Sequence, residues 1–172
     1  MMDNNHHDVQ DLLNQINRVQ ENRAATADVA PPRQVLGLLL GDELYGLEII
    51  SIRGISRLQP LTFVPGAPPM IVGVTSLRGQ MLPVVDLRAL LGIASLPRPA
   101  DDPARSRARI VVVAQGEIQA GLLVDGVTEV YDVRGAVEPP IGPATLTEGQ
   151  VLLADRLLVL INLPNLLARL TG

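Results

Sequence analysis

The chain repeats itself at a spacing of 75 to 76 residues, and this repeat limits the folds that it can adopt. Gly41 and Gly46 recur 75 positions later as Gly116 and Gly121. The apolar residues that keep this spacing are Val35, Leu38, Ile49, Ile52 and Ile55, matched by Ile110, Val113, Val124, Val127 and Val130. Matched glycines at matched turns indicate that two backbones make the same unusual approach. The repeat therefore predicts two similar small units within 172 residues.

A second match, offset by 76, covers the end of each unit. Its members are Leu82, Val84, Asp86, Leu87, Leu90 and Leu91, matched by Leu158, Leu160, Asn162, Leu163, Leu166 and Leu167. Asp86 and Asn162 each stand between a strand pattern and a helical run, and both residue types are favoured helix N-caps. A catalytic carboxylate replaced by an amide would lose its charge. We therefore interpret Asp86 as a cap rather than as an acid or a metal ligand.

From Gln34 onward, short apolar runs are broken by Gly, Pro and Asp, which is typical of an all-β domain. Hairpin turns are expected at residues 41–43, 78–79 and 115–116, a last strand at 157–161, a terminal helix at 163–170 and a surface loop at 94–108. Together with the repeat, this pattern predicts two five-stranded barrels within residues 34–172. Units of this size are marginal alone, so a shared apolar seam is expected between them.

Residues 1–33 are expected to form a separate polar extension, partly helical or disordered. Its apolar residues Val9, Leu12, Leu13, Ile16 and Val19 fall at helical spacing. This stripe fits a helix that docks on a partner or on a second copy of the chain. It also fits a frayed helix on a disordered tail, which is the favoured interpretation because so short a helix is marginal alone.

The composition excludes several kinds of chemistry. The chain has no Cys and no Lys, which excludes thiolate catalysis, Schiff bases and phosphate-loop lysines. Its only histidines, His6 and His7, lie in the polar extension, so no base is available to activate a serine in the folded part. Asp125-Gly126 is interpreted as a turn or bulge in which Gly126 admits a positive φ. We predict a non-enzymatic binding module with no catalytic residue, metal or cofactor.

Nucleic acid and membrane are not expected partners. The net charge of −4 lacks the excess of positive charge that nucleic-acid binding needs, and the chain has few aromatic side chains for stacking on bases. The uncharged stretch 58–77 contains four prolines, so it is not a spanning helix.

Arg78 is the residue that stands out as functional. Gly79 supplies a positive φ at the tip of a hairpin, in a loop of two or three residues, and Arg78 is then directed outward. There its guanidinium has the donors to bind a partner's carboxylate or helix C-terminus. The residues alone fit equally well a solvated arginine beside an obligatory glycine.

Several segments resemble the CheW-like coupling proteins of bacterial chemosensory arrays. They include the block from Ile71 to Arg88, with its Gly-Val-x-x-Leu-Arg-Gly-x-x-x-Pro-Val-x-Asp-Leu pattern. The other matching segments, in the family's order, are Leu44-Tyr45-Gly46-Leu47-Glu48-Ile49, Phe63-Val64-Pro65-Gly66-Ala67-Pro68, Gly121 to Val127 and Asp155-Arg156-Leu157. The resemblance covers residues 34–170 and implies two intertwined SH3-like five-stranded barrels with short helices.

The resemblance also implies a function and a set of partners. Family members are non-enzymatic adaptors that couple methyl-accepting chemoreceptors to a CheA-type histidine kinase. The expected partners are the kinase's regulatory domain and the receptor's cytoplasmic tip, at cytoplasmic arrays beneath the membrane. Positions that match receptor or kinase contacts in the family are Ile52, Gly73, Val74 and Arg78, and we place Gly79, next to Arg78 in the turn, with them among the partner-binding residues.

At Gly54 the sequence departs from the family's pattern in charge, and two alternative functions remain open. Family members often carry Glu in the slot that Gly54 occupies here after Arg53, so we place Gly54 among the partner-binding residues and expect a partner of different charge there. One alternative is the coupling protein of an accessory, non-flagellar chemosensory pathway. The other is a self-assembling structural protein that forms homo-rings through exposed barrel edges and the 8–19 helix.

Overall fold

The computed structural model describes residues 4–25, 33–93, 103–134, 137–139 and 146–171. The elements of the first half are α1 (Asn4–Ala25), β1 (Arg33–Leu40), β2 (Glu43–Glu48), η1 (Ile49–Ser51), β3 (Ile52–Arg57), β4 (Ile71–Leu77), β5 (Gln80–Asp86) and α2 (Leu87–Leu91). Those of the second half are η2 (Pro103–Arg107), β6 (Arg109–Gln115), β7 (Ile118–Val124), β8 (Gly126–Val133), β9 (Thr147–Leu152), β10 (Leu157–Ile161) and α3 (Leu163–Thr171). The expected hairpins, last strand and terminal helix are present. Of the loop expected at 94–108, residues 94–102 lie outside the described residues, and η2 occupies most of the rest.

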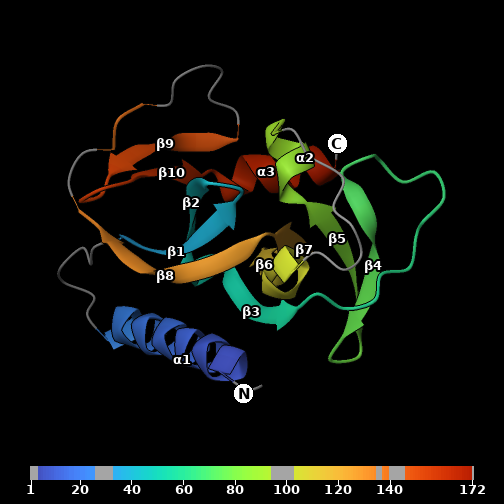
Figure 1. Ribbon diagram of the computed structural model, residues 1–172, viewed down its shortest axis with the longest axis horizontal. Helices are drawn as coiled ribbons and strands as arrows, with labels where there is room; N and C mark the ends of the chain where they lie inside the picture. Colours follow the sequence, from blue (N-terminus) through green and yellow to red (C-terminus); the bar gives the residue numbers. More distant parts are fainter. Residues whose placement is uncertain (1–3, 26–32, 94–102, 135–136, 140–145, 172) are drawn as a thin grey trace.

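The strands form two five-stranded sheets of the same design (Figure 1). Sheet A has the order β8-β1-β2-β10-β9 and sheet B the order β3-β6-β7-β5-β4. In each sheet one internal pair is parallel, β2 with β10 and β5 with β7, and the other ladders are antiparallel. Since no ladder joins the two outer strands of either sheet in the described part of the chain, each unit is an open SH3-like barrel.

The two sequence repeats exchange strands. β3 continues from β2 in the chain but pairs with β6 in sheet B, while its repeat mate β8 pairs with β1 in sheet A. Each sheet is therefore assembled from two strands of one repeat and three of the other. The expected intertwined pair of five-stranded subdomains is confirmed, and no single cut of the chain would separate them.

One apolar core joins the two sheets. A single cluster of buried side chains includes Leu36 and Leu47 of sheet A with Val111 and Leu122 of sheet B, all fully buried. A second, smaller cluster lies within sheet A around Leu158. A shared apolar seam was expected because each unit is too small to be stable alone. This seam is the main core of the molecule.

The matched glycines Gly46 and Gly121 are needed for close packing against side chains of the neighbouring strands. A Cβ atom on Gly46 would lie 3.0 Å from Leu160 Cδ2, and one on Gly121 would lie 2.7 Å from Ile110 Cγ2. In the ladders Gly46 pairs with Leu160 and Gly121 with Val84, and these partners are repeat mates. The glycine match therefore reflects one packing constraint met twice.

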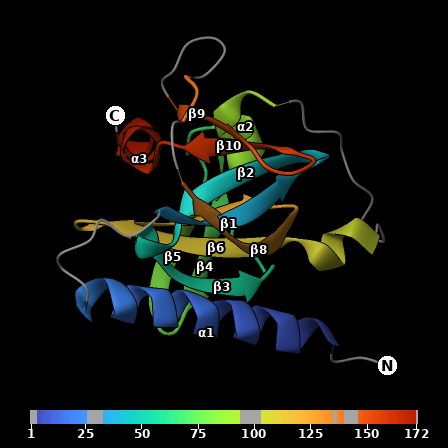
Figure 2. The same cartoon turned by 90° about the vertical axis from the view of Figure 1, so that its left-hand side faces the viewer.

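α1 packs against the rest of the protein instead of forming a frayed tail. It lies along β3 and β8 at the opposite side from α2 and α3 (Figures 1 and 2). Leu12 and Ile16 of its apolar stripe are 9% and 2% exposed and belong to the main core. Gln20 Nε2 donates to Ile49 O at 2.8 Å. The favoured expectation of a frayed helix is wrong for this stripe, because β3 and β8 present an apolar surface that covers it.

Candidate partner-binding site

Arg78 and Gly79 form the two-residue turn between β4 and β5. Their φ angles are 51° and 79°, the double positive φ of a type I′ hairpin. Arg78 is the one non-glycine residue with a positive φ in the described part of the chain, and both turn residues are exposed. Within the described residues Arg78 makes no hydrogen bond or ion pair. The turn therefore exposes a guanidinium that has no partner in the described part of the chain, in a backbone conformation that favours glycine or asparagine.

Gly54 comes together with Arg78 at a surface pocket. The pocket is partly open, has a volume of about 180 Å³ and is lined in part by Arg53, Gly54 and Arg78. β3 carries a bulge here, because Ile52 pairs with Val113 while Gly54 pairs with Val112, and this leaves Arg53 as the extra residue. Bulges often redirect a side chain at a functional edge.

Ile52, Gly73 and Val74 are not among the residues described as lining this pocket. Ile52 is 3% exposed and belongs to the core cluster that also contains Leu12 and Ile16 of α1. Gly73 is buried at φ 157°, where a Cβ would lie 2.8 Å from Thr62 O. Val74 is half-buried, and its backbone exchanges two hydrogen bonds of 2.9 Å with Thr62. Of the six residues expected to bind partners, the structure brings Gly54 and Arg78 to one pocket and places Gly79 beside them in the turn.

Asp86 caps α2, as its repeat position predicts. Its Oδ1 accepts the Arg88 amide at 3.0 Å, and in the repeat mate Asn162 Oδ1 accepts the Asn165 amide at 3.1 Å. In the described residues, no group of three or more His, Cys, Asp or Glu side chains is arranged to hold a metal ion. None of the described helices is long and apolar enough to span a membrane.

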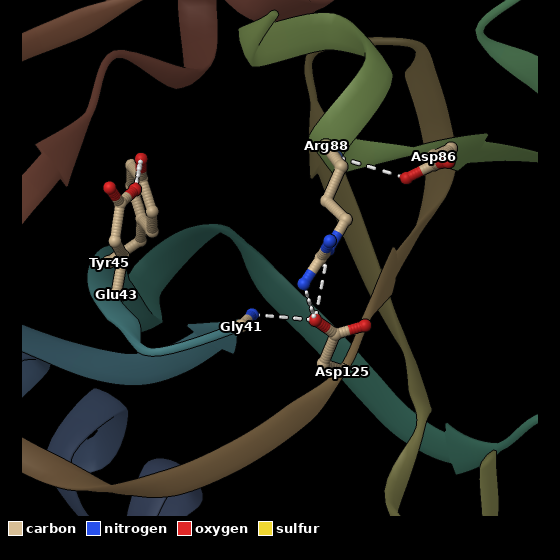
Figure 3. Close-up of polar contacts among 6 residues, drawn as sticks. All are labelled: Gly41, Glu43, Tyr45, Asp86, Arg88 and Asp125. Atoms are coloured by element: carbon tan, nitrogen blue, oxygen red, sulfur yellow. Dashed lines mark hydrogen bonds and ion pairs between the residues drawn. The ribbon is translucent and has the colours of Figure 1, made fainter. Parts of the chain in front are cut away.

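Asp125 has a role that the sequence did not reveal. Its Oδ2 accepts Arg88 Nη2 and the Gly41 amide, each at 2.6 Å (Figure 3). The expectation of a positive φ at Gly126 is wrong, since Gly126 is the first residue of β8 and is not among the glycines with positive φ. Arg88 and Asp125 are 37 positions apart, and no periodicity in the sequence links them.

Tyr45 and Glu43 form a second polar contact, at the start of β2 (Figure 3). The Tyr45 hydroxyl donates to Glu43 Oε2 at 2.6 Å. Burial, the hydrogen bond and the charge of Glu43 together raise the pKa of Tyr45 above its ordinary value. The hydroxyl is therefore held in its protonated form as a donor.

Arg109 is the most deeply buried charged side chain described, at 3% exposed. Its Nη1 donates to Ser106 O at 2.8 Å and to Ala108 O at 2.9 Å, which fastens the end of η2 to β6. Burial and then the charge of neighbouring Arg57 lower the pKa of Arg109. The Nη1 contacts are structural, since they serve the protein's own carbonyls, while the buried Nε has no hydrogen-bond partner among the described residues.

A family model described as the CheW-like domain matches residues 34–171, which span both sheets and α3. The chain belongs to the CheW-like family. It is 36% identical over 109 residues to a probable chemotaxis protein CheW of Rhizobium etli, an alignment that spans 63% of this chain and 66% of that protein. It is 29% identical over 142 residues to the chemotaxis protein CheW of Klebsiella aerogenes, covering 79% of this chain and 82% of that protein.

The fold agrees with this CheW-like assignment. The crystal structure of the scaffolding protein TtCheW from Thermoanaerobacter tengcongensis matches with a TM-score of 0.67 at 29% identity, over 76% of this chain and 89% of that one. Similarity extends to proteins with other names, FrzA of Myxococcus xanthus and PilI of Pseudomonas aeruginosa. The family resemblance noted in the sequence is confirmed.

Proposed function

We propose that this CheW-like chain is a non-enzymatic adaptor that couples methyl-accepting chemoreceptors to a CheA-type histidine kinase. The observation that carries the proposal is the family match over 34–171, the whole two-sheet unit. The relatives' names, chemotaxis protein CheW and scaffolding protein, support a role in assembly rather than in catalysis. The site of action is then the cytoplasmic face of a receptor array, which the protein reaches through its partners.

Arg78 is the residue to which we assign partner recognition, with Gly79 and Gly54 beside it. Its exposure, its positive φ and its lack of a hydrogen-bond or ion-pair partner among the described residues support this assignment. Ile52, Gly73 and Val74 contribute in a different way. Their burial and backbone contacts hold β3 and β4 in place, so these residues affect partner binding indirectly, through the position of the two strands.

The experiment is gel-filtration co-elution of the full chain with the regulatory domain of each CheA-type kinase from the same organism. We expect co-elution with one kinase, and weaker co-elution for Arg78→Ala with an unchanged melting temperature. Arg169→Ala, which removes an exposed arginine from α3, is the matched control. A well-folded protein that binds no kinase and no receptor tip would contradict the proposal.

An accessory chemosensory pathway is the second candidate. The similarity to FrzA and PilI, which are not named for CheW, favours it. The co-elution experiment separates the two candidates, because the kinase that binds identifies the pathway.

Self-assembly into homo-rings is the remaining candidate. Leu152 and Leu157, at the β9–β10 end of sheet A, are 78% and 44% exposed, and Met81 in β5 of sheet B is 68% exposed. These apolar side chains give each unit an exposed end that a second copy can cover. Light scattering over a concentration series tests this candidate, and a constant monomeric mass excludes it.

A further inference from the structure

The pocket beside Arg78 combines an apolar floor with a positively charged rim. Leu77, Leu82 and Val112 contribute apolar surface, and Arg53 and Arg78 contribute the charges. Ser56, Gln80 and Gln119 add neutral polar groups to the lining. No aspartate or glutamate is among the described residues that line it. Two like charges at one pocket repel each other, and an anion between them would relieve this repulsion. The pocket is therefore complementary to a negatively charged group with an apolar stem.

Both Arg53 and Arg78 have N–H donors that make no hydrogen bond within the described residues. Arg78 makes no hydrogen bond or ion pair within the described residues. Arg53 makes one, from Nη1 to Ile50 O at 2.8 Å, out of the five donors of a guanidinium. Arg53 is also the bulged residue of β3, so its side chain is directed away from the regular ladder. Charge-assisted hydrogen bonds to a carboxylate are about twice as strong as neutral ones.

The size of the pocket fits one side chain. Its volume of about 180 Å³ is near the ~150 Å³ of a cavity that accepts benzene. It is smaller than the roughly 300–1,000 Å³ of ordinary small-molecule sites. Gly54 keeps the space open, because no atom of the described residues lies within 4 Å of where its Cβ would be.

We propose that this pocket receives a glutamate side chain from the partner protein. The two methylenes lie on the floor of Leu77, Leu82 and Val112, and the carboxylate accepts hydrogen bonds from Arg78 and Arg53. The inference rests on the proposed function only in taking Arg78 as a partner-recognition residue. The inference adds which chemical group of the partner is recognised at Arg78, namely a glutamate carboxylate.

The first test uses a small probe, so that it needs no kinase or receptor. N-acetylglutamate N-methylamide is titrated into the full chain while amide NMR shifts of Gly54 and Gly79 are followed, in parallel with the glutamine analogue and methyl phosphate. We expect saturable shifts for the glutamate probe and at least fivefold weaker binding for the glutamine analogue. Equal binding of the two amino-acid probes, or tighter binding of methyl phosphate, would overturn the assignment of a carboxylate.

The second test fills the pocket from within. Gly54→Glu supplies a carboxylate in cis, and Gly54→Gln is the uncharged control of nearly equal size. Gly54 has no positive φ, so both side chains fit its backbone conformation. We expect Gly54→Glu to reduce probe binding at least tenfold and Gly54→Gln to reduce it less, while Arg169→Ala leaves it unchanged. Equal losses in the two Gly54 variants would show that space alone matters and would contradict the inference.

The two proposals fail in different ways. If the glutamate probe binds as expected but no kinase or receptor tip co-elutes, the pocket chemistry stands and the adaptor function does not. If a kinase and a receptor tip each co-elute equally well with Gly54→Glu and with the unchanged chain, the adaptor function stands and the pocket inference is overturned. Arg78→Asn serves as a second loss-of-charge variant, because asparagine is favoured in a type I′ turn and will fold.

Discussion

Arg88 donates two hydrogen bonds to one carboxylate oxygen of Asp125, from Nε at 2.9 Å and from Nη2 at 2.6 Å. The same oxygen accepts the amide of Gly41. Arg88 lies in α2 beside sheet B, and Gly41 lies in the β1–β2 turn of sheet A. Asp125 follows β7 of sheet B and precedes β8 of sheet A, so this one side chain fastens both sheets where the chain crosses between them.

Asp125→Ala is expected to lower the free energy of unfolding by about 2 kcal/mol, because hydrogen bonds to charged groups contribute about 1.5–3 kcal/mol and Arg88 is only 14% exposed. Urea denaturation measures the change. A double-mutant cycle with Arg88→Ala should give a coupling energy above about 0.5 kcal/mol. Arg134→Ala is the control, since its 3.7 Å ion pair with Asp132 is exposed and should contribute little. A change in Asp125→Ala as small as that control would contradict a linking role.

Arg78→Asn is expected to stabilise the fold while it weakens partner binding. Arg78 holds a φ of 51°, which costs a non-glycine residue about 1 kcal/mol, and asparagine tolerates this conformation better. We therefore expect the midpoint of urea unfolding to rise and co-elution with the kinase domain to fall. Arg78→Ala, which lacks the side-chain amide of asparagine, should show the loss of binding without the rise. A fall in stability for Arg78→Asn would show that Arg78 has a structural role.

Ile16→Ala is expected to loosen α1 from the β3–β8 surface. Ile16 is 2% exposed, and truncating a buried isoleucine costs about 2–5 kcal/mol. Hydrogen exchange of the α1 amides should accelerate at least tenfold. Exchange at Ile52, beneath the helix, should rise as well. Asn17→Ala, at an exposed neighbouring position, should leave both rates unchanged. Equal rates in the two variants would mean that α1 does not depend on this contact.

The repeat made much of the fold predictable. It anticipated the paired hairpins, the caps at Asp86 and Asn162, and the close approaches at Gly46 and Gly121. Each of these features is local in sequence or depends on a residue type that suits few backbone conformations. The turn at Arg78 and Gly79 was predictable for the same reason.

Contacts between distant segments were not predictable. The apolar positions of β3, such as Ile52, match those of β8, such as Val127, so the pattern does not say which sheet either strand joins. The docking of α1 depends on the apolar surface that β3 and β8 create together. The contact of Arg88 with Asp125 exists only once α2 and the β7–β8 junction are in place. For the candidate site, the sequence indicated Arg78 and Gly54, but the pocket between them depends on the bulge at Arg53.

Stability above about pH 10 should depend on Tyr45. The chain has no lysine or cysteine, so few side chains titrate between pH 9 and 11. The folded protein raises the pKa of Tyr45 above that of the unfolded chain, through burial and the bond to Glu43. Below about pH 10 both states keep the proton, and above it only the unfolded state releases it. The free energy of unfolding should therefore fall as the pH rises, with a slope of up to about 1.4 kcal/mol per pH unit.

Tyr45→Phe tests this dependence, because it keeps the ring and removes the titrating hydroxyl. At pH 8 the variant should lose about 1 kcal/mol, the contribution of the hydrogen bond to Glu43. Between pH 9.5 and about 11, urea denaturation should show a falling stability for the unchanged chain and a flatter one for Tyr45→Phe, so that the two curves converge. The difference in absorbance at ~295 nm between the two proteins reports on ionisation of Tyr45, because the second tyrosine, Tyr131, is common to both. Parallel curves for the two proteins would place the alkaline sensitivity at another group and contradict the role of the Tyr45–Glu43 contact.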